Sequence, residues 1–204
     1  MRIILIRHGE TYANELFHTD DRLLIGALDT QIAQLNDKGR QQAKSASKQL
    51  ENIHIDEIYS SDLGRTIETT SLIFPNRTFK TTPLLRERSL GSDEGKKAIE
   101  LFSNPSVWER HVNTEIDTIE ECMSKKVSDG ENYIMVFNRL NEFLSQFDFN
   151  EDKTIVCVAH FHTIRCMIYT LLNKKPDREL FNLMIPNASP ILFEYQNGKF
   201  TYMK

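Results

Sequence analysis

The sequence contains little cysteine and no long apolar run. Its three cysteines, Cys122, Cys157 and Cys166, show no CxxC spacing, and their odd number argues against a disulfide framework. Cys157 lies inside an apolar run, as is typical of a buried core thiol. No apolar stretch approaches the length of a membrane span, and the first apolar run is too short for a signal peptide. We therefore expect a cytoplasmic protein that does not associate with a membrane.

An excess of positive charge is also missing. Lys and Arg together number 25 against 29 Asp and Glu, for a net charge of -4. This balance argues against nucleic acid as a partner, because nucleic-acid binders usually carry a basic face. The 204 residues contain no internal repeat, low-complexity tract or Pro/Gly-rich linker. We expect a single domain over residues 1–204, and no feature of the sequence indicates an oligomeric state.

Apolar patterns typical of strands and of helices follow one another along the chain. The expected strands are residues 2–6, 55–61, 76–81 and 154–159, with a terminal hairpin of 188–195 and 199–202 joined at Asn197-Gly198. The expected helices are a short one after Thr11, 37–50 with Asn36 as N-cap, one capped by Asp62 that runs to Phe74, 131–147 and 164–172. This alternation predicts an α/β fold, with a mostly parallel sheet covered by helices on both faces.

The pattern loosens between about residues 91 and 129. This stretch contains the single tryptophan, Trp108, and a charged run from Glu115 to Lys126. We expect a helical insertion that forms a cap over the functional site. A solvated helical segment without ligand contact is the alternative.

Polar side chains follow several of the predicted strands. His8 and His160 each come directly after a buried strand, and Arg7 precedes His8. Arg65 lies in the opening turn of the helix after strand 55–61, and Glu87 lies in a polar segment beyond residue 81. Because parallel strands end at one edge of the sheet, where ligands bind in open α/β folds, we expect these side chains to converge there.

This set of residue types suits a phosphoryl group. Arginine forks bind its oxygens bidentately, and a histidine can add a further donor. Neighbouring arginines disfavour an imidazolium, so His8 should stay neutral and nucleophilic. A carboxylic acid can protonate the departing alkoxide, and Glu87, Glu94 and Glu10 are candidates for that acid on composition.

Other interpretations of the same residues remain open at this point. A histidine after a strand can simply cap or hydrogen-bond, and Arg65 or Glu87 could be solvated surface residues. A metal site is disfavoured, because His160 and His162 are two residues apart and no HxxxH pattern or carboxylate cluster accompanies them.

Several ordered motifs resemble those of the histidine phosphatase superfamily, which includes the phosphoglycerate mutases. Arg7-His8-Gly9-Glu10-Thr11 is similar to the family signature, and Asn14 stands at the expected offset. The other similar blocks are Asp29, Ile32, Leu35, Gly39 and Gln42-Ala43; residues 59–65 with Thr69; residues 85–91; Gly130-Glu131 with Arg139; and Asn187-Ala188-Ser189. Together they cover most of the chain.

The resemblance implies a role for each residue. His8 would be the nucleophile that becomes phosphohistidine, and Arg7, Arg65 and His160 would bind the phosphoryl group. Glu87, four residues before Gly91, would be the general acid in preference to Glu94, and Asn14 would contact the phosphate or the substrate. The implied fold is a three-layer α/β/α sandwich, and members of the family need no metal or other cofactor.

Two residues depart from the family pattern next to the second histidine. Phe161 and His162 stand where the family usually has glycines, which let the backbone approach phosphate closely. We expect Phe161 and His162 to reshape the pocket and contact the substrate. Asp93, Asn132 and Asn36 also differ from the common family residues.

The leading functional hypothesis is a metal-independent phosphatase that acts on a small phosphorylated metabolite. A phosphoglycerate mutase would use the same residues, but the segment after Asn14 runs Glu15-Leu16-Phe17-His18-Thr19 instead of the mutase pattern Phe-Thr-Gly-Trp. A non-catalytic protein that binds phosphorylated ligands is the alternative of a different class, since Phe161 and His162 replace glycines.

Overall fold

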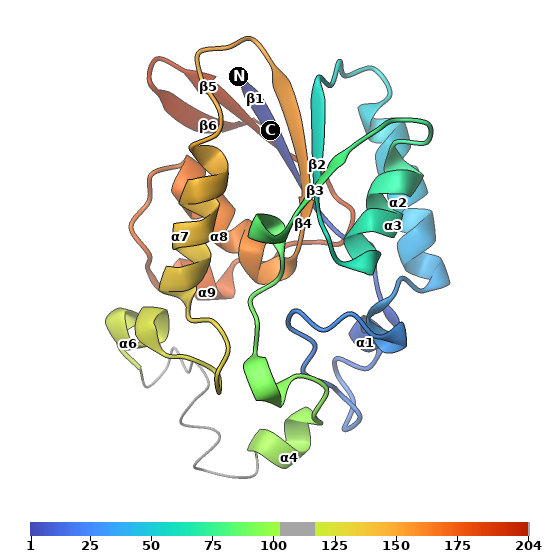
Figure 1. Cartoon of the computed structure of the whole chain (residues 1–204), viewed down its shortest axis with the longest axis vertical. Helices are drawn as coiled ribbons and strands as arrows, with labels where there is room; N and C mark the ends of the chain where they lie inside the picture. Colours follow the sequence, from blue (N-terminus) through green and yellow to red (C-terminus); the bar gives the residue numbers. More distant parts are fainter. Residues whose placement is uncertain (103–116, 204) are drawn as a thin grey trace.

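A six-stranded sheet forms the centre of the computed structural model, which describes residues 1–102 and 117–203 (Figure 1). The strand order is β3-β2-β4-β1-β5-β6. The strands are β1 (Arg2–Arg7), β2 (Glu57–Ser61), β3 (Lys80–Thr82), β4 (Thr154–Ala159), β5 (Ile191–Gln196) and β6 (Lys199–Met203). Strands β3, β2, β4 and β1 run parallel, and β5 and β6 add an antiparallel edge.

Helices cover the sheet on both faces. Helices α2 (Asp37–Leu50) and α3 (Gly64–Ile73) pack on one face, and α7 (Tyr133–Leu144) and α8 (Phe161–Leu171) pack on the other (Figure 1). Alternate side chains of β1 separate accordingly, because Ile4 and Ile6 join the α2–α3 core whereas Ile3 and Leu5 join the α7–α8 core. Both faces of β4 are fully buried in the same way. The predicted α/β/α sandwich with a mostly parallel sheet is confirmed.

Most predicted elements are present with shifted ends. The short helix after Thr11 is α1 (Tyr12–Glu15), and Asn36 caps α2 by accepting a hydrogen bond from the Gly39 amide at 2.7 Å. The terminal hairpin turns at Asn197 and Gly198, whose positive φ angles of 54° and 80° suit a type I′ turn. The third strand begins at Lys80 instead of residue 76, and the sequence did not predict α9 (Arg178–Asn182).

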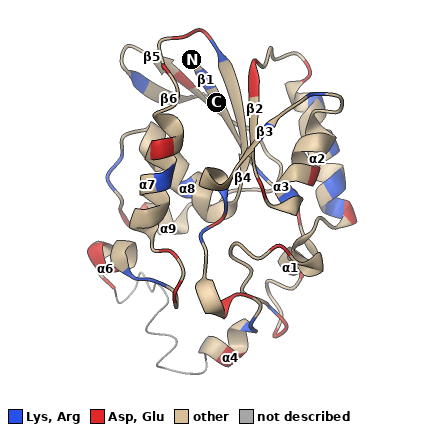
Figure 2. Cartoon of the chain, in the orientation of Figure 1, with Lys and Arg blue, Asp and Glu red and all other residues tan. Residues whose placement is uncertain are grey.

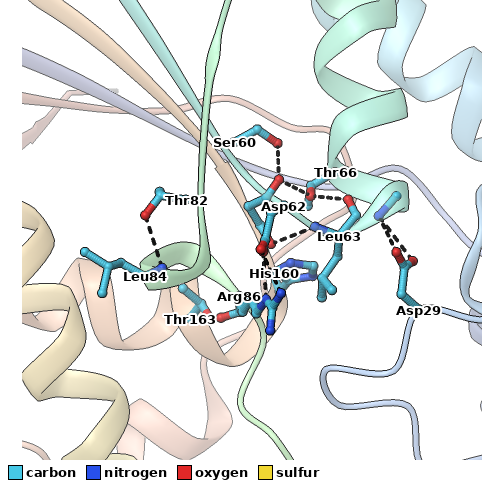
Figure 3. A network of polar contacts seen from close by, with 12 residues as sticks. Asp29, Ser60, Asp62, Leu63, Thr66, Thr82, Leu84, Arg86, His160 and Thr163 are labelled. Atoms are coloured by element: carbon cyan, nitrogen blue, oxygen red, sulfur yellow. Dashed lines mark hydrogen bonds and ion pairs between the residues drawn. The ribbon is translucent and has the colours of Figure 1, made fainter.

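The start of α3 corrects one expectation. Asp62 does not cap this helix; the N-cap residue is Leu63, which offers no side-chain hydrogen bond. The carboxylate of Asp29 instead accepts a hydrogen bond from the Gly64 amide, at 3.0 and 3.1 Å for its two oxygens, as Figure 3 shows. Asp62 is engaged in a bidentate ion pair with Arg86, with both N–O distances at 2.7 Å.

The segment predicted as an insertion begins and ends at neighbouring points of the fold. Gly91 and Gly130 lie in backbone contact, and the Glu131 amide donates to the Ser89 carbonyl at 2.9 Å. Its described parts are short: a 3₁₀ turn at Gly91–Asp93, α4 (Ala98–Phe102) and α6 (Ile119–Ser124). Trp108 lies outside the described residues. The function of the inserted segment as a cap stays a prediction.

Two 3₁₀ turns, at Gln31–Ala33 and Pro83–Leu85, complete the described elements. Over the same residues no helix is both long enough and apolar enough to cross a membrane. All three cysteines are buried free thiols, which confirms Cys157 as a core residue. Residues of both charges occur along the described ribbon, and α2 carries mostly cations, with Asp37 as its one acid (Figure 2).

Candidate active site

The two histidines that follow β1 and β4 lie side by side at the carboxyl edge of the sheet. Arg7 and Ala159 are register partners, and the His8 amide donates to the Ala159 carbonyl at 3.0 Å. The imidazole rings of His8 and His160 are therefore neighbours, with centroids 5.2 Å apart. Both are buried, at 5% and 0% exposure. The structure thus brings them together as the pattern predicts.

The hydrogen bonds of His8 define its tautomer. Its Nδ1 lies 2.7 Å from the Gly9 carbonyl oxygen, which can only accept, so Nδ1 carries the proton. Burial, together with the charges of Arg65 and Arg7, holds the pKa of His8 well below its usual value. His8 is thus a neutral imidazole whose Nε2 lone pair is available to attack an electrophile.

His160 has the opposite arrangement. Arg65 donates from Nε to His160 Nδ1 at 3.2 Å, so the ring proton lies on Nε2. That Nε2 is buried and has no partner among the residues that the structure describes. Burial and the charge of Arg65 keep the pKa of His160 low. His160 therefore presents a neutral N–H donor beside the His8 ring.

The two arginines are anchored by backbone carbonyls. Arg65 donates to the carbonyls of Leu28 and Gly26 at 2.8 and 2.9 Å. Arg7 donates from Nη1 to the Ile185 carbonyl at 2.9 Å, while its buried Nε has no partner within the described part of the chain. Burial lowers the pKa of Arg7 to about 10, so it remains a cation at neutral pH. Both side chains are held rigidly and keep N–H groups for an anion.

Glu87 caps helix α8 from another segment. His160 is the N-cap residue of α8 but gives no side-chain hydrogen bond. The Glu87 carboxylate accepts instead from the amides of His162 and Thr163, at 3.1 to 3.2 Å, and from the Arg88 amide at 2.9 Å. Burial raises the pKa of Glu87, but the hydrogen bonds from these amides and the charge of Arg65 outweigh it, so the net pKa lies below its usual value.

Two contacts of neighbouring Arg86 hold the segment that carries Glu87 in place. Thr163 donates from its hydroxyl to the Arg86 carbonyl, and Arg86 forms the ion pair with Asp62 (Figure 3). These contacts join α8, the loop before α3 and the residues around Glu87. The carboxylate is thereby held at the same sheet edge as the histidines.

The other two candidate acids are engaged elsewhere. Glu10 pairs with Lys38 at 2.8 Å and accepts from Asn36. Glu94 accepts from the amides of Ala27 and Leu90, both at 2.8 Å. Glu87 is therefore the carboxylate that directly contacts the helix behind His160.

The structure does not bring Asn14 into contact with these residues. Its side-chain oxygen accepts from the Thr11 amide at 3.1 Å, which completes a capping box for α1. Gly9, next to His8, donates its amide to Thr69 at 3.0 Å. A contact of Asn14 with substrate stays a prediction.

Phe161 and His162 occupy the first turn of α8. The Phe161 ring contacts two guanidinium groups, with Arg7 Cζ 4.8 Å and Arg165 Cζ 3.9 Å from its centroid. His162 Nδ1 is 2.8 Å from the Tyr133 hydroxyl, and burial lowers the pKa of His162 to about 3. Sequence reasoning missed Tyr133 and Arg165. A charged residue inside the apolar pattern of α8 was the signal for Arg165.

Among residues 1–102 and 117–203, no group of three or more His, Cys, Asp or Glu side chains could hold a metal ion. A surface hollow of about 500 Å³ lies between α7, the end of α8 and the β5–β6 hairpin, and none of the candidate site residues lines it. The polar cluster at the sheet edge is the site that the chemistry favours.

Comparison with known proteins gives a consistent result. The model of the histidine phosphatase superfamily (branch 1) matches residues 3–204. A 2,3-bisphosphoglycerate-dependent phosphoglycerate mutase from Blochmanniella floridana is 25% identical over 227 residues, which cover 97% of this chain and 94% of the mutase.

Two solved structures share the fold over the whole chain. The alpha-ribazole phosphatase from Shigella flexneri has a TM-score of 0.80 at 22% identity, covering 100% of this chain and 95% of that one. A phosphoserine phosphatase from Entamoeba histolytica, in complex with 3-phosphoglyceric acid, has a TM-score of 0.78 at 25% identity, with the same coverage. Phosphatases and a mutase are thus among the proteins that this chain resembles.

Proposed function

The chain belongs to the histidine phosphatase superfamily, and on that premise we propose that it is a metal-independent phosphatase, with a phosphohistidine intermediate on His8. The substrate class is a phosphomonoester of a small metabolite. The observation that carries this proposal is the pair of buried histidines 5.2 Å apart, one with its Nε2 lone pair available and one whose N–H has no partner among the described residues.

In the first step His8 Nε2 attacks phosphorus, and the bond from phosphorus to the ester oxygen breaks. Arg7, Arg65 and the Nε2–H of His160 stabilise the negative charge on the equatorial oxygens. Glu87 donates a proton to the departing alkoxide, which leaves as an alcohol. The charge of a phosphoryl dianion beside Glu87 raises the pKa of that carboxyl, so substrate binding itself favours the protonated form.

In the second step water hydrolyses the phosphohistidine. The Glu87 carboxylate takes a proton from the attacking water, whose oxygen bonds to phosphorus as the bond to His8 Nε2 breaks. Inorganic phosphate leaves, and His8 returns to its neutral form. The bonds of Glu87 to three backbone amides keep it oriented for both proton transfers.

A rapid-quench experiment tests the intermediate. Wild type mixed with ³²P-labelled phosphomonoester should form acid-labile, base-stable phosphoprotein within one turnover, and His8→Ala should form none. His18→Ala, at an exposed position, is the matched control and should label like wild type. The enzyme hypothesis fails if wild type binds phosphate without labelling, or if His8→Ala hydrolyses an aryl phosphate equally well.

A mutase would form the same phosphohistidine but return the group to a second hydroxyl. Incubation with 3-phosphoglycerate distinguishes the two activities. We expect inorganic phosphate to be released, with little 2-phosphoglycerate formed. Efficient isomerisation would replace hydrolysis as the function.

A further inference from the structure

Building on the proposed function, we infer that Glu94 is a positioning residue for Arg65, the arginine from α3 that binds the phosphoryl group. Glu94 acts through one loop, residues 26–29, which holds the guanidinium of Arg65. The phosphoryl-transfer steps do not use Glu94, which entered only as a rival for the general acid. The inference depends on a continuous set of hydrogen bonds that runs from Glu94 through the loop and Arg65 to His160.

Loop 26–29 contacts Arg65 and its neighbour from successive positions. The carbonyls of Gly26 and Leu28 accept hydrogen bonds from Nη2 and Nη1 of Arg65, at 2.9 and 2.8 Å. The carboxylate of Asp29 accepts from the amide of Gly64, the residue before Arg65 (Figure 3). Arg65 is buried, so water does not readily replace these acceptors if the loop moves away. The position of loop 26–29 therefore sets the orientation of the guanidinium.

One oxygen of Glu94 joins this loop to the segment that carries Glu87. Glu94 Oε1 accepts from the Ala27 amide at 2.8 Å, between the two carbonyls that hold the arginine. The same oxygen accepts from the Leu90 amide at 2.8 Å and from the Ser89 hydroxyl at 3.2 Å. Ser89 and Leu90 follow Glu87 closely in the chain. A single carboxylate oxygen thus links the loop of the phosphoryl-binding arginine to the segment of the proposed general acid.

The backbone around Glu94 leaves the loop little freedom. Gly26 has a positive φ of 49°, and a Cβ at this position would lie 2.5 Å from Glu94 Oε1. Next to this contact the two strands of chain pair with each other: the Gly95 amide donates to the Leu24 carbonyl at 2.7 Å, and the Leu24 amide donates to the Lys96 carbonyl at 3.0 Å. The base of the inserted segment therefore holds loop 26–29 against Arg65 through both backbone pairing and the Glu94 side chain.

The effect of Glu94 extends from Arg65 to His160. Arg65 donates from Nε to His160 Nδ1 at 3.2 Å, and this bond keeps the His160 proton on Nε2. Without Glu94, the Ala27 and Leu90 amides lose their acceptor, and loop 26–29 moves to find another. Two groups that stabilise the equatorial oxygens, the Arg65 guanidinium and the His160 N–H, then lose their alignment together.

A double-mutant cycle tests this coupling by isothermal titration calorimetry with inorganic phosphate. Glu94→Ala should weaken phosphate binding by about tenfold when Arg65 is present, and by less than about twofold in an Arg65→Lys background. The lysine has no planar fork for the loop to orient, so the Glu94 contact has little left to contribute. An equal weakening in both backgrounds would overturn the inference, because Glu94 would then act independently of Arg65.

Two further variants separate the hydrogen bonds of Glu94 from its charge. Glu94→Gln keeps an oxygen that can accept the same three bonds, so it should bind phosphate within about threefold of wild type. Glu94→Asp is one methylene shorter and should bind as weakly as Glu94→Ala. A Glu94→Gln protein as weak as Glu94→Asp would contradict the inference, and this comparison does not require Glu94→Ala to fold. Glu142→Ala, at an exposed position on α7, is the control and should keep the wild-type affinity.

Damage to the fold is recognised by the stoichiometry of the titration. Unfolded molecules lower the number of sites per chain, whereas a misplaced Arg65 lowers the affinity of sites that are all present. We expect the stoichiometry of Glu94→Asp and Glu94→Gln to equal that of wild type. A loss of sites in Glu94→Asp, with unchanged affinity in the remaining ones, would show that Glu94 supports only the fold.

These titrations require no turnover, so they separate the role of Glu94 from the proposed activity. If wild type forms no phosphohistidine while the cycle shows coupling, the positioning role stands and the catalytic proposal fails. If wild type hydrolyses phosphomonoesters while Glu94→Ala weakens phosphate binding equally in both backgrounds, the activity stands and the positioning role fails.

Discussion

Two histidines of one site take opposite tautomers because each Nδ1 has a different partner. The Gly9 carbonyl accepts from His8, whereas the Arg65 guanidinium donates to His160. A carbonyl forces the proton onto Nδ1, and a guanidinium forces it onto Nε2. The same side chain thereby offers a lone pair on Nε2 in one position and an N–H donor on Nε2 in the other. Neither assignment needs a charged imidazole.

Glu87→Gln should slow the cleavage of substrates whose leaving group needs a proton and should spare substrates whose leaving group needs none. The amide oxygen can still accept from the backbone amides, but it cannot supply a proton. We expect kcat/KM for an alkyl phosphate to fall by about 10²- to 10⁴-fold, the usual contribution of a general acid. With p-nitrophenyl phosphate, whose leaving group needs no proton, the pre-steady-state burst of nitrophenol should persist.

Glu94→Gln is the matched control, because Glu94 is the rival acid and its backbone contacts also suit an amide oxygen. The activity of Glu94→Gln should not fall more for substrates with basic leaving groups than for substrates with weakly basic ones. A leaving-group-dependent loss in Glu94→Gln, with none in Glu87→Gln, would transfer the acid role to Glu94.

Some residues of the site were predictable from the sequence, and others required the fold. His8, His160 and Arg7 directly follow or end buried strands, so their position at the sheet edge follows from the pattern. Tyr133 and Arg165 lie on helices, where the pattern predicts core or surface but not which neighbouring helix they face. Their contacts with Arg88 and Phe161 depend on how α7 packs against α8.

At the scale of elements, helix ends show where local sequence stops being informative. Asn36 caps α2 through the amide three residues ahead, a local contact that the sequence predicts. The start of α3 is capped by Asp29, 35 residues earlier in the chain. Asp62 was the local candidate for this cap, but its carboxylate forms an ion pair with Arg86 instead. A cap supplied from a distant loop has no signature in the segment that it caps.

The start of α2 also fixes the backbone beside His8. A Cβ at Gly39 would lie 2.0 Å from the Glu10 carbonyl oxygen, and one at Gly9 would lie 2.4 Å from the Gly39 oxygen. The two backbone segments can approach this closely only because both residues are glycine. The orientation of the His8 ring thus depends on an element in which no catalytic residue lies.

Gly39→Ala tests this dependence. Helix propensity alone favours alanine by about 1 kcal/mol, but the clash with backbone should cost about 1–3 kcal/mol and displace the Gly9–Glu10 segment. We expect a lower midpoint in urea and a lower kcat. Ser45→Ala, at an exposed position of the same helix, should be neutral or slightly stabilising with unchanged activity. A Gly39→Ala protein that is more stable and fully active would show that the close approach is dispensable.

On the scale of the whole molecule, one sheet edge gathers residues that are far apart in the chain. Arg7 ends β1 and His8 follows it, Arg65 lies on α3, Glu87 lies in the segment after β3, and His160 follows β4. Parallel strand ends place them together, and the two-sided core holds the edge in place. Folding therefore buries three histidines, His8, His160 and His162, in a cationic environment that keeps them neutral.

This burial predicts how the stability of the whole protein depends on pH. The folded pKa values of these histidines lie below the value of about 6.5 expected in the unfolded chain, so the unfolded state binds more protons as the pH falls below that value. The free energy of unfolding should be highest above about pH 6.5 and decrease by up to about 1.4 kcal/mol per pH unit for each histidine below it. Urea titrations between about pH 7.5 and 5.5 measure this slope above the range where most carboxylates titrate. His162→Gln should reduce the slope by about a third, whereas His18→Gln, at an exposed position, should leave it unchanged. A wild-type stability that is constant over this range would mean that the three imidazoles accept protons as readily in the folded state as in the unfolded one, and the neutral nucleophile would then have to be abandoned.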